Sequence, residues 1–318
     1  MDVTATLDPE IAALLAASPL GALDLGSLTP EMLTTMQDAT RNMEPPQLPP
    51  TTTTSRTVVV GESDGAFDLS ARVYSPPTVR TDRGCLYWIH GGGFIMGSGL
   101  TQDPRLDRWV EELDCVAVSI DYRLAPGHPY PKPLDDCHLG LQWTVSHADE
   151  LGIDPTRIVL AGASAGAGLA AALALLARDR GEIAVAHQLL VYPMLDDRMI
   201  TPSSQIEGAP IWSREANVLG WRSYLGHEPG VNGVDAYAAP ARATDLANLP
   251  PTWIGVGTLD IFRDEDIDYA SRLLASGVPT ELHVYAGAPH GFEMLAASSG
   301  VARRFQLDMD DALRRAFG

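Results

Sequence analysis

The chain has 318 residues, of which 45% are hydrophobic, and its formal net charge at pH 7 is −19. This length is enough for one α/β domain with an elaboration, or for two modest domains. A surface this acidic repels phosphate backbones and anionic lipid, which argues against nucleic acid as a partner. The sequence has no run of about 18 uninterrupted apolar residues, so we expect no membrane span.

The N-terminal segment and the three cysteines each support an expectation, the first about the compartment and the second about the state of the thiols. The N-terminal segment carries Asp2 where a signal peptide would carry basic residues, so we expect a cytoplasmic protein. The three cysteines, Cys85, Cys115 and Cys137, include no Cys-x-x-Cys spacing. They are therefore expected to be reduced and mostly buried, and not to form a disulfide or a metal site.

Residues 1–50 are expected to be helical with breaks. One helix is predicted over 9–17 and another over 30–36, where Thr29 can cap the helix and Pro30 occupies its first position. The Pro-rich stretch 44–50 then has the composition of a semi-rigid, extended linker.

Beyond residue 51 the pattern changes to strands. Residues 57–60 and 68–74 are predicted strands, and the alternation of the second is typical of an antiparallel edge. The nearly continuous apolar runs 85–89 and 115–120 predict central strands that are covered on both faces. Strands and helices then alternate. The predicted helices are 134–149, 165–179, 263–276 and 301–317, and the predicted strands are 157–161, 187–192, 252–257 and 280–285. This order predicts an α/β fold with a mostly parallel, twisted sheet flanked by helices.

The alternation stops between residues 195 and 230, which are aromatic-rich and partly helical in pattern. An insertion after a central strand lies over the carboxyl end of the sheet, where ligands bind in such folds. We therefore expect 1–50 and 195–230 to form a helical cap. The catalytic domain would then consist of 51–194 and 231–318.

Ser164 is the first candidate catalytic residue. It is the centre of a Gly-x-Ser-x-Gly motif at 162–166, which follows the predicted strand 157–161 and precedes the predicted helix 165–179. This context is typical of the nucleophile elbow of an α/β-hydrolase, where a tight turn pushes the serine oxygen out of the sheet edge.

A serine nucleophile needs a histidine base that is itself oriented by a carboxylate, and in α/β-hydrolases the order is serine, acid, histidine. Four histidines follow the serine: His187 at the start of a strand, His227 in the expected cap, His283 within a strand, and His290 in a loop. The loop of His290 comes just past the carboxyl end of the last predicted strand, where catalytic residues are delivered. We therefore expect His290 to be the general base.

Asp260 is the favoured acid, because it lies just beyond the carboxyl end of the strand 252–257. Asp196 and Asp197 are the alternatives, since they also follow a predicted strand. The further acidic residues in 264–268 are expected to form a solvated face at the start of a helix, where the helix dipole favours them.

A glycine-rich segment, His90-Gly91-Gly92-Gly93-Phe94, directly follows the strand ending at residue 89. Glycines let backbone N–H groups approach a substrate closely, and this motif contributes to the oxyanion hole of lipases and esterases. The expected donors are the N–H groups of Gly91, Gly92 and Ala165. A phosphate-binding loop is disfavoured, because no Gly-Lys-Ser/Thr follows. His90 is expected to hold the loop by hydrogen bonding.

With these residues assigned, the chain resembles the hormone-sensitive-lipase-like family of bacterial carboxylesterases. The matching segments are 90–94, 121–126, 162–166, and Asp260 with Asp264-Glu265 followed by 290–292. The resemblance implies an α/β-hydrolase with a helical cap that hydrolyses short- to medium-chain acyl esters, needs no metal or cofactor, and is often a homodimer. Ala163, Ala167 and Gly127 depart from the residues common in the family, which weakens any transfer of substrate preference.

The sequence therefore predicts a serine carboxylesterase acting on a small-molecule ester, with Trp212 and Trp221 as candidate walls of the substrate pocket. An acyltransferase, lactonase or amidase could use the same triad. A non-catalytic small-molecule receptor is a further alternative, but such a protein would be expected to lose part of the triad, and Ser164, Asp260 and His290 are all present.

Overall fold

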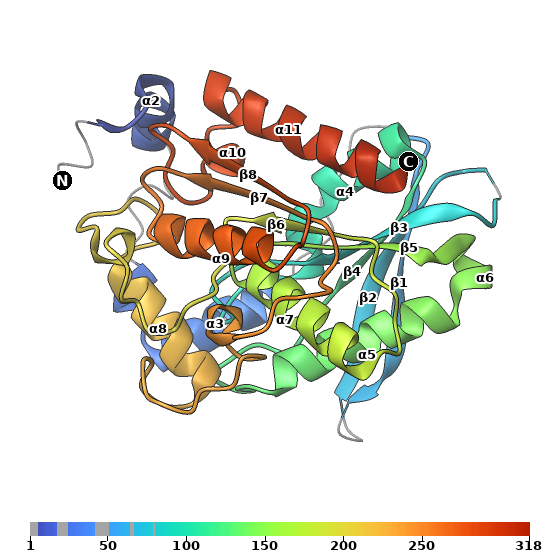
Figure 1. The fold of residues 1–318 in the computed structure, drawn as a ribbon, viewed down its shortest axis with the longest axis horizontal. Coiled ribbons are helices and arrows are strands. Elements are labelled where there is room, and N and C mark those ends of the chain that lie inside the picture. Colours follow the sequence, from blue (N-terminus) through green and yellow to red (C-terminus); the bar gives the residue numbers. More distant parts are fainter. Residues whose placement is uncertain (1–5, 18–24, 42–50, 64–66, 79) are drawn as a thin grey trace.

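The structure is a computed structural model that describes residues 6–17, 25–41, 51–63, 67–78 and 80–318. Eight strands form one sheet in the order β1-β2-β4-β3-β5-β6-β7-β8 (Figure 1). They are β1 (Thr54–Ser63), β2 (Phe67–Ser75), β3 (Arg83–Ile89), β4 (Val116–Ile120), β5 (Ile153–Ala163), β6 (His187–Val191), β7 (Thr252–Gly257) and β8 (Thr280–Tyr285). Each strand that the sequence predicts coincides with one of these.

The sheet is mostly parallel, as predicted. From β4 through β3, β5, β6 and β7 to β8, every neighbouring pair is parallel. Only β1 with β2 and β2 with β4 pair antiparallel. The alternating segment 68–74 is antiparallel as expected, but the edge position belongs to β1 and not to β2.

Helices cover both faces of the sheet (Figure 1). The longer ones outside the N-terminal part are α4 (Asp103–Leu113), α5 (Lys132–Ser146), α7 (Ala165–Arg180), α8 (Arg214–Leu225), α9 (Arg263–Ala275) and α11 (Gly300–Phe317), and the short ones include α6 (Ala148–Leu151) and α10 (Phe292–Leu295). Helix α4 was not predicted. The predicted helix 134–149 is divided into α5 and α6.

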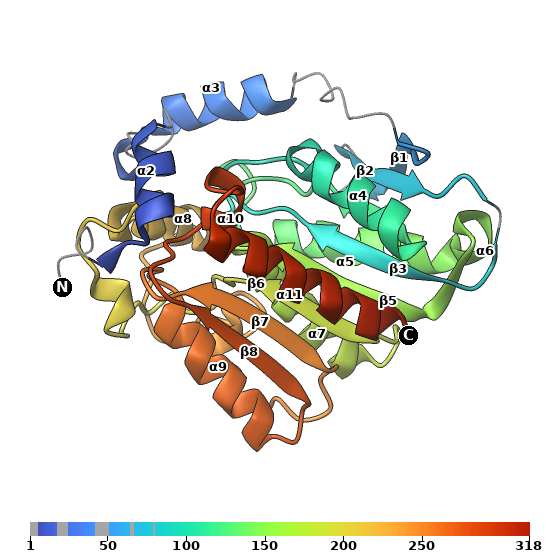
Figure 2. The ribbon, with the colours of Figure 1, turned by 90° about the horizontal axis from the view of Figure 1, so that it is seen from above.

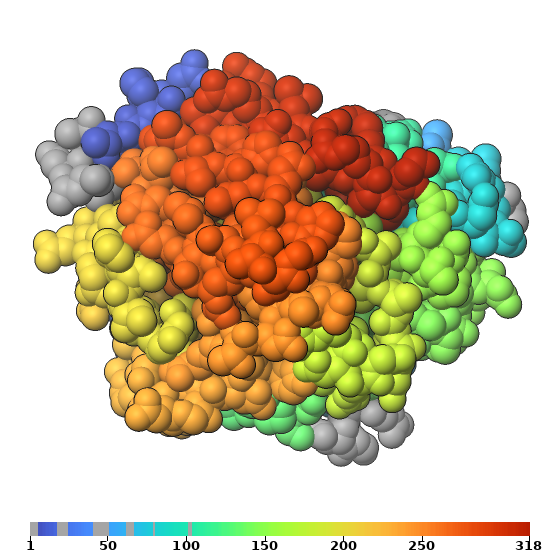
Figure 3. All heavy atoms as spheres, in the orientation of Figure 1, coloured from blue at the N-terminus to red at the C-terminus, as the bar shows by residue number. Residues whose placement is uncertain are grey.

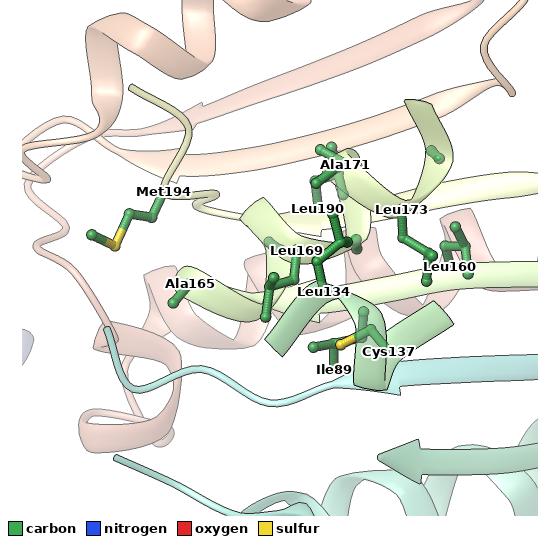
Figure 4. Packing of buried hydrophobic residues seen from close by; sticks show 14 of the residues in the cluster. Ile89, Leu134, Cys137, Leu160, Ala165, Leu169, Ala171, Leu173, Leu190 and Met194 are labelled. Atoms are coloured by element: carbon green, nitrogen blue, oxygen red, sulfur yellow. The ribbon is translucent and has the colours of Figure 1, made fainter. Parts of the chain in front are cut away.

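Two hydrophobic cores result from the alternation of side chains along the central strands. In β3, Tyr87 and Ile89 belong to the core beneath α5, α7 and α9, while Leu86 and Trp88 belong to the core beneath α4 and α11. Figure 4 shows part of the first core, with Leu134, Cys137, Ile89, Leu160, Ala165, Leu169, Leu173 and Leu190 gathered between helices and sheet. Figure 3 shows the residues of α9 and α11 forming much of the near surface over the strands. A strand that is buried on both faces reads as a continuous apolar run, which is why the sequence predicted it.

The N-terminal helices and α8 gather at one end of the sheet (Figures 1 and 2). Helix α2 spans Pro9–Ala17 and α3 spans Pro30–Arg41. The side-chain amide of Gln37 in α3 donates to the carbonyls of Ile95 and Ala125, at 2.8 and 2.9 Å. The N–H of Asp8 donates to the carbonyl of Gly287 at 2.9 Å. The N-terminal part is thereby fixed to three loops of the sheet domain, which follow β3, β4 and β8. The predicted linker 44–50 lies outside the described residues.

All three cysteines are buried and carry free thiols, as expected. Burial raises the pKa of Cys115 to about 12. In the part of the chain that the structure describes, no helix has both the length and the apolar character needed to cross a membrane.

Candidate active site

Ser164 lies in a strained turn between β5 and α7. Its backbone has φ 58° and ψ −123°, a conformation that residues other than glycine rarely adopt. A side chain on Gly162 would lie 2.5 Å from the backbone of Gly166, and one on Gly166 would collide with the carbonyls of Ile89 and His90. The two flanking glycines therefore permit the tight turn, which raises the serine above the end of β5.

The structure brings Ser164, His290 and Asp260 together. Nε2 of His290 lies 3.0 Å from Oγ of Ser164, and Nδ1 of His290 lies 2.7 Å from Oδ2 of Asp260. Asp260 is fully buried, and its Oδ1 accepts the N–H of Phe262 at 3.0 Å. The imidazole can therefore take the serine proton at one nitrogen while the carboxylate holds the other.

The competing carboxylates have other partners. Asp196 accepts hydrogen bonds from the backbone and the guanidinium of Arg198. Asp197 is fully buried and accepts two hydrogen bonds from the guanidinium of Arg242 and one from the N–H of Gly230. Both residues therefore stabilise the region after β6.

The other three candidate histidines lie elsewhere. His187 begins β6, at the end opposite to its carboxyl terminus, and burial together with Arg315 lowers its pKa to about 4. The Nδ1 of His227 lies 2.9 Å from the carbonyl of Glu228. His283 pairs with Glu281 at 2.6 Å. Among the described histidines, only His290 forms a hydrogen bond with the candidate nucleophile.

The glycine-rich loop lies directly beside the nucleophile. A side chain on Gly91 would stand 2.7 Å from the carbonyl oxygen of Ala163 and 3.3 Å from Cβ of Ser164. Gly92 has φ 119°, and its carbonyl accepts the N–H groups of residues 95 and 96, each at 3.0 Å. Within the described ranges, the N–H groups of Gly91, Gly92 and Ala165 donate to no other protein group. These donors are therefore available to a ligand near Ser164.

His90 supports this loop. Its ring stacks on Tyr122 with 4.3 Å between centroids, and its Nδ1 lies 2.8 Å from the carbonyl of Gly91. The hydroxyl of Tyr122 donates to the carbonyl of His90 at 3.0 Å. Burial lowers the pKa of His90, so the ring is held neutral. The predicted supporting role of His90 agrees with these contacts.

A cavity of about 410 Å³ opens beside Ser164 and His290. Its other lining residues are apolar or small for the most part: Leu25, Met36, Thr40, Gly91, Gly92, Gly93, Met96, Gly97, Ala163, Tyr192, Ile211, Trp212, Gly291, Met294 and Leu295. The three methionines of the lining were not predicted from the sequence. They come from three separate segments, so no motif groups them.

The two candidate pocket tryptophans differ in position. Trp212 lines the cavity, and its indole N–H donates to Oδ1 of Asn217 at 3.3 Å. Trp221 does not line this cavity. It is fully buried in the core, where its ring packs against Phe94 and Tyr224. The expectation for Trp221 is corrected accordingly, because the inner side of α8 packs against the sheet domain and not against the cavity.

Of the acidic residues in 264–268, Asp268 is exposed as expected, but Glu265 and Asp266 do not belong to a solvated face. Glu265 is buried, and its Oε1 accepts the N–H groups of Leu195 and Asp196. Asp266 is fully buried, and neither carboxyl oxygen has a hydrogen-bond partner among the described residues. Burial raises the pKa of both carboxyl groups well above the usual range. The described part of the chain contains no cluster of three His, Cys, Asp or Glu residues able to hold a metal ion.

The chain is similar to known α/β-hydrolases and esterases. A family model described as the alpha/beta hydrolase fold matches residues 86–294. The chain is 38% identical over 230 residues to esterase LipI of Mycobacterium tuberculosis, covering 71% of this chain and 72% of LipI. It is 39% identical over 237 residues to carboxylesterase NlhH of the same species, covering 72% of each.

Two solved structures extend the likeness to 99% of the chain. A bacterial heroin esterase superposes with a TM-score of 0.89 at 38% identity, covering 99% of both chains. Esterase LipW of Mycobacterium marinum superposes with a TM-score of 0.85 at 33% identity, covering 99% of this chain and 98% of LipW. The chain therefore belongs to the hormone-sensitive-lipase-like family of α/β-hydrolases.

Proposed function

We propose that the protein is a serine carboxylesterase in which Ser164 is the nucleophile, His290 the general base and Asp260 the orienting acid. The observation that carries this proposal is the imidazole of His290, which bridges Ser164 at 3.0 Å and Asp260 at 2.7 Å. The named relatives support the reaction type, because they are esterases.

The first half of the reaction forms an acyl-enzyme. Oγ of Ser164 attacks the ester carbonyl while Nε2 of His290 takes its proton, and Asp260 stabilises the imidazolium. The N–H groups of Gly91, Gly92 and Ala165 stabilise the oxyanion of the tetrahedral intermediate. The intermediate collapses as the imidazolium gives its proton to the leaving alcohol. A water molecule, deprotonated by the same imidazole, then hydrolyses the acyl-enzyme.

The lining and the volume of the cavity favour neutral esters of short- to medium-chain acids as substrates. Apart from His290, the described residues that line the cavity carry no ionisable side chain except the hydroxyl of Tyr192, which donates to Glu293. Its volume of about 410 Å³ is at the small end of the range for small-molecule sites. The cap would consist of residues from 1–50 and 195–230, because Leu25, Met36 and Trp212 line the cavity from those two segments.

The test is hydrolysis of p-nitrophenyl esters from acetyl to palmitoyl, comparing the parent chain with Ser164→Ala. Short and medium esters should turn over, and the substitution should lower kcat by about 10⁴-fold or more. Turnover that survives the substitution would exclude Ser164 as the nucleophile. No turnover by the parent chain on any ester would contradict the esterase proposal.

We also propose a cytoplasmic location and a homodimer. The buried free thiols of Cys85, Cys115 and Cys137 support a reducing compartment. The dimer is supported by the family resemblance alone. Cell fractionation tests the location, and light scattering coupled to size-exclusion chromatography tests the dimer.

A further inference from the structure

A buried charged network lies behind the imidazole of His290. The hydroxyl of Tyr192 donates to both carboxylate oxygens of Glu293, at 2.7 and 2.9 Å. Arg105 donates to Oε1 of the same carboxylate at 2.9 Å. The Glu293 side chain is 1% exposed and the Arg105 side chain 10% exposed. Three segments that are distant in sequence therefore meet at one carboxylate.

Tyr192 connects this network to the proposed catalytic residues. Its ring meets the His290 ring edge-on, with 4.5 Å between centroids. Its backbone has φ 36°, an unfavourable value for a residue other than glycine. The neighbouring Val191 accepts the N–H of Ser164 at 2.8 Å, and the N–H of Tyr192 donates to Gly255 at 2.8 Å. Tyr192 therefore lies at the junction of the segments that carry the nucleophile and the base.

Glu293 is also close to the base along the chain. It belongs to α10, the short helix that begins two residues after His290, and Gly291 between them has φ 67°. The carboxylate of Glu293 connects this segment to Tyr192, the residue that follows β6, and to Arg105 in α4.

Arg105 is held in place on its other side. Its guanidinium lies 5.9 Å from the ring of Trp88 and 5.7 Å from that of Trp109. A cation that packs against two aromatic rings and pairs with a buried carboxylate has little freedom to move. It is therefore a rigid anchor for Glu293.

We propose that Glu293 is a positioning residue for the imidazole of His290, anchored by Arg105 and acting through the ring of Tyr192. This inference rests on the proposed function, in which His290 is the base. Glu293 and Arg105 do not line the cavity beside Ser164, whereas Tyr192 does. The network fixes the direction of the imidazole toward Ser164, and a misplacement of about 1 Å at such a group can lower a rate by about 100-fold.

The test uses Glu293→Gln, which keeps the shape of the side chain and removes its charge. We expect kcat for a short p-nitrophenyl ester to fall by about 10- to 100-fold, with KM changed by less than about threefold. The rate at which a p-nitrophenyl phosphonate labels Ser164 should fall by a similar factor, because labelling also requires the aligned base. Unchanged kcat and labelling rate would overturn the proposal.

A second variant separates positioning from folding. Glu293→Gln alone leaves the buried Arg105 unpaired, which destabilises the fold. Arg105→Met combined with Glu293→Gln removes both charges, so the double variant should fold with a Tm near that of the parent. If the network positions His290, kcat of the double variant stays low. A full return of kcat would show that the network serves only stability, and would overturn the proposal.

Asp310→Asn is the matched control. Asp310 pairs with Arg108 at 2.8 Å, so it anchors the same helix α4 without contact to the His290 loop. It should lower Tm and leave kcat within about twofold. His290→Ala separates the two proposals: if it retains turnover, the proposed function fails, whereas if it abolishes turnover while Glu293→Gln keeps full kcat, only the positioning role fails.

Discussion

Asp260 holds Nδ1 of His290 at 2.7 Å with one carboxylate oxygen and accepts the N–H of Phe262 with the other. The carboxylate thus has a fixed orientation in a fully buried position. In Asp260→Asn the amide can present a donor to Nδ1, which favours the wrong tautomer of the imidazole. We expect kcat to fall by about 10⁴-fold with little change in KM. Steady-state kinetics on a short ester measures both.

Asp197→Asn is the control for that prediction, since Asp197 is an equally buried aspartate and was one of the two alternative acids, with Asp196. Its carboxylate pairs with Arg242, so the substitution breaks a buried ion pair. The free energy of unfolding should fall by about 3 kcal/mol while kcat stays within about threefold. A larger loss of kcat in Asp197→Asn than in Asp260→Asn would reverse the assignment of the acid.

Gly91→Ala should damage the oxyanion hole. The new Cβ would lie 2.7 Å from the carbonyl oxygen of Ala163, so the loop must move away from Ser164. Loss of an oxyanion donor lowers kcat by about 10²- to 10³-fold. Gly127→Ala is the control, because its Cβ would meet only the carbonyl of Leu124 at 3.7 Å, an ordinary contact. Equal kinetic effects of the two substitutions would contradict this role of the Gly91 loop.

The fold could be predicted from the sequence where a strand has its own local signal. The runs at β3 and β4 are continuous because both faces are buried, and every residue of these strands is buried in the structure. The sequence of α4 also contains a helical pattern, although this helix was not predicted. Leu106, Trp109 and Val110 recur at helical spacing and are all fully buried in the core beneath α4 and α11.

The site was predictable only as far as motifs extend. Ser164 and His290 have local sequence contexts that indicate the roles proposed for them. The burial of Asp266 and the position of Trp221 depend on how whole helices pack against the rest of the protein. A local sequence pattern does not predict this packing. Glu293 and Arg105 are 188 residues apart, so their ion pair could be found only in three dimensions.

Trp212→Leu should shift the preference toward longer acyl chains. The indole lies against the backbone of Gly93, so closely that a side chain there would collide with it, and it forms one wall of the cavity. A smaller side chain leaves room for further methylenes, each worth about 1 kcal/mol or more when accommodated. We expect the ratio of kcat/KM for octanoyl over acetyl esters to rise about tenfold.

The control for this change is Trp143→Leu. Trp143 of α5 stacks on His147 and does not belong to the cavity lining. Its replacement by leucine should therefore leave the ratio of octanoyl to acetyl kcat/KM unchanged. A chain-length profile of Trp212→Leu that matches that of Trp143→Leu would remove Trp212 from the substrate pocket.

Asp266→Asn should stabilise the protein at alkaline pH. Burial, with Glu265 and Asp260 nearby, raises the pKa of Asp266 well above the usual range, so the folded state keeps this group neutral. The unfolded chain releases the proton near pH 4. Between these two pKa values the unfolded state binds fewer protons, so the free energy of unfolding falls as pH rises, by about 1.4 kcal/mol for each unit of difference. The amide introduced by the substitution cannot ionise, so the variant does not lose this stability.

Urea unfolding should therefore show a higher midpoint for Asp266→Asn at pH 8 and a smaller gain at pH 4.5. Asp268→Asn, at an exposed position of the same helix, should show neither effect. A gain that grows toward low pH would contradict a neutral Asp266.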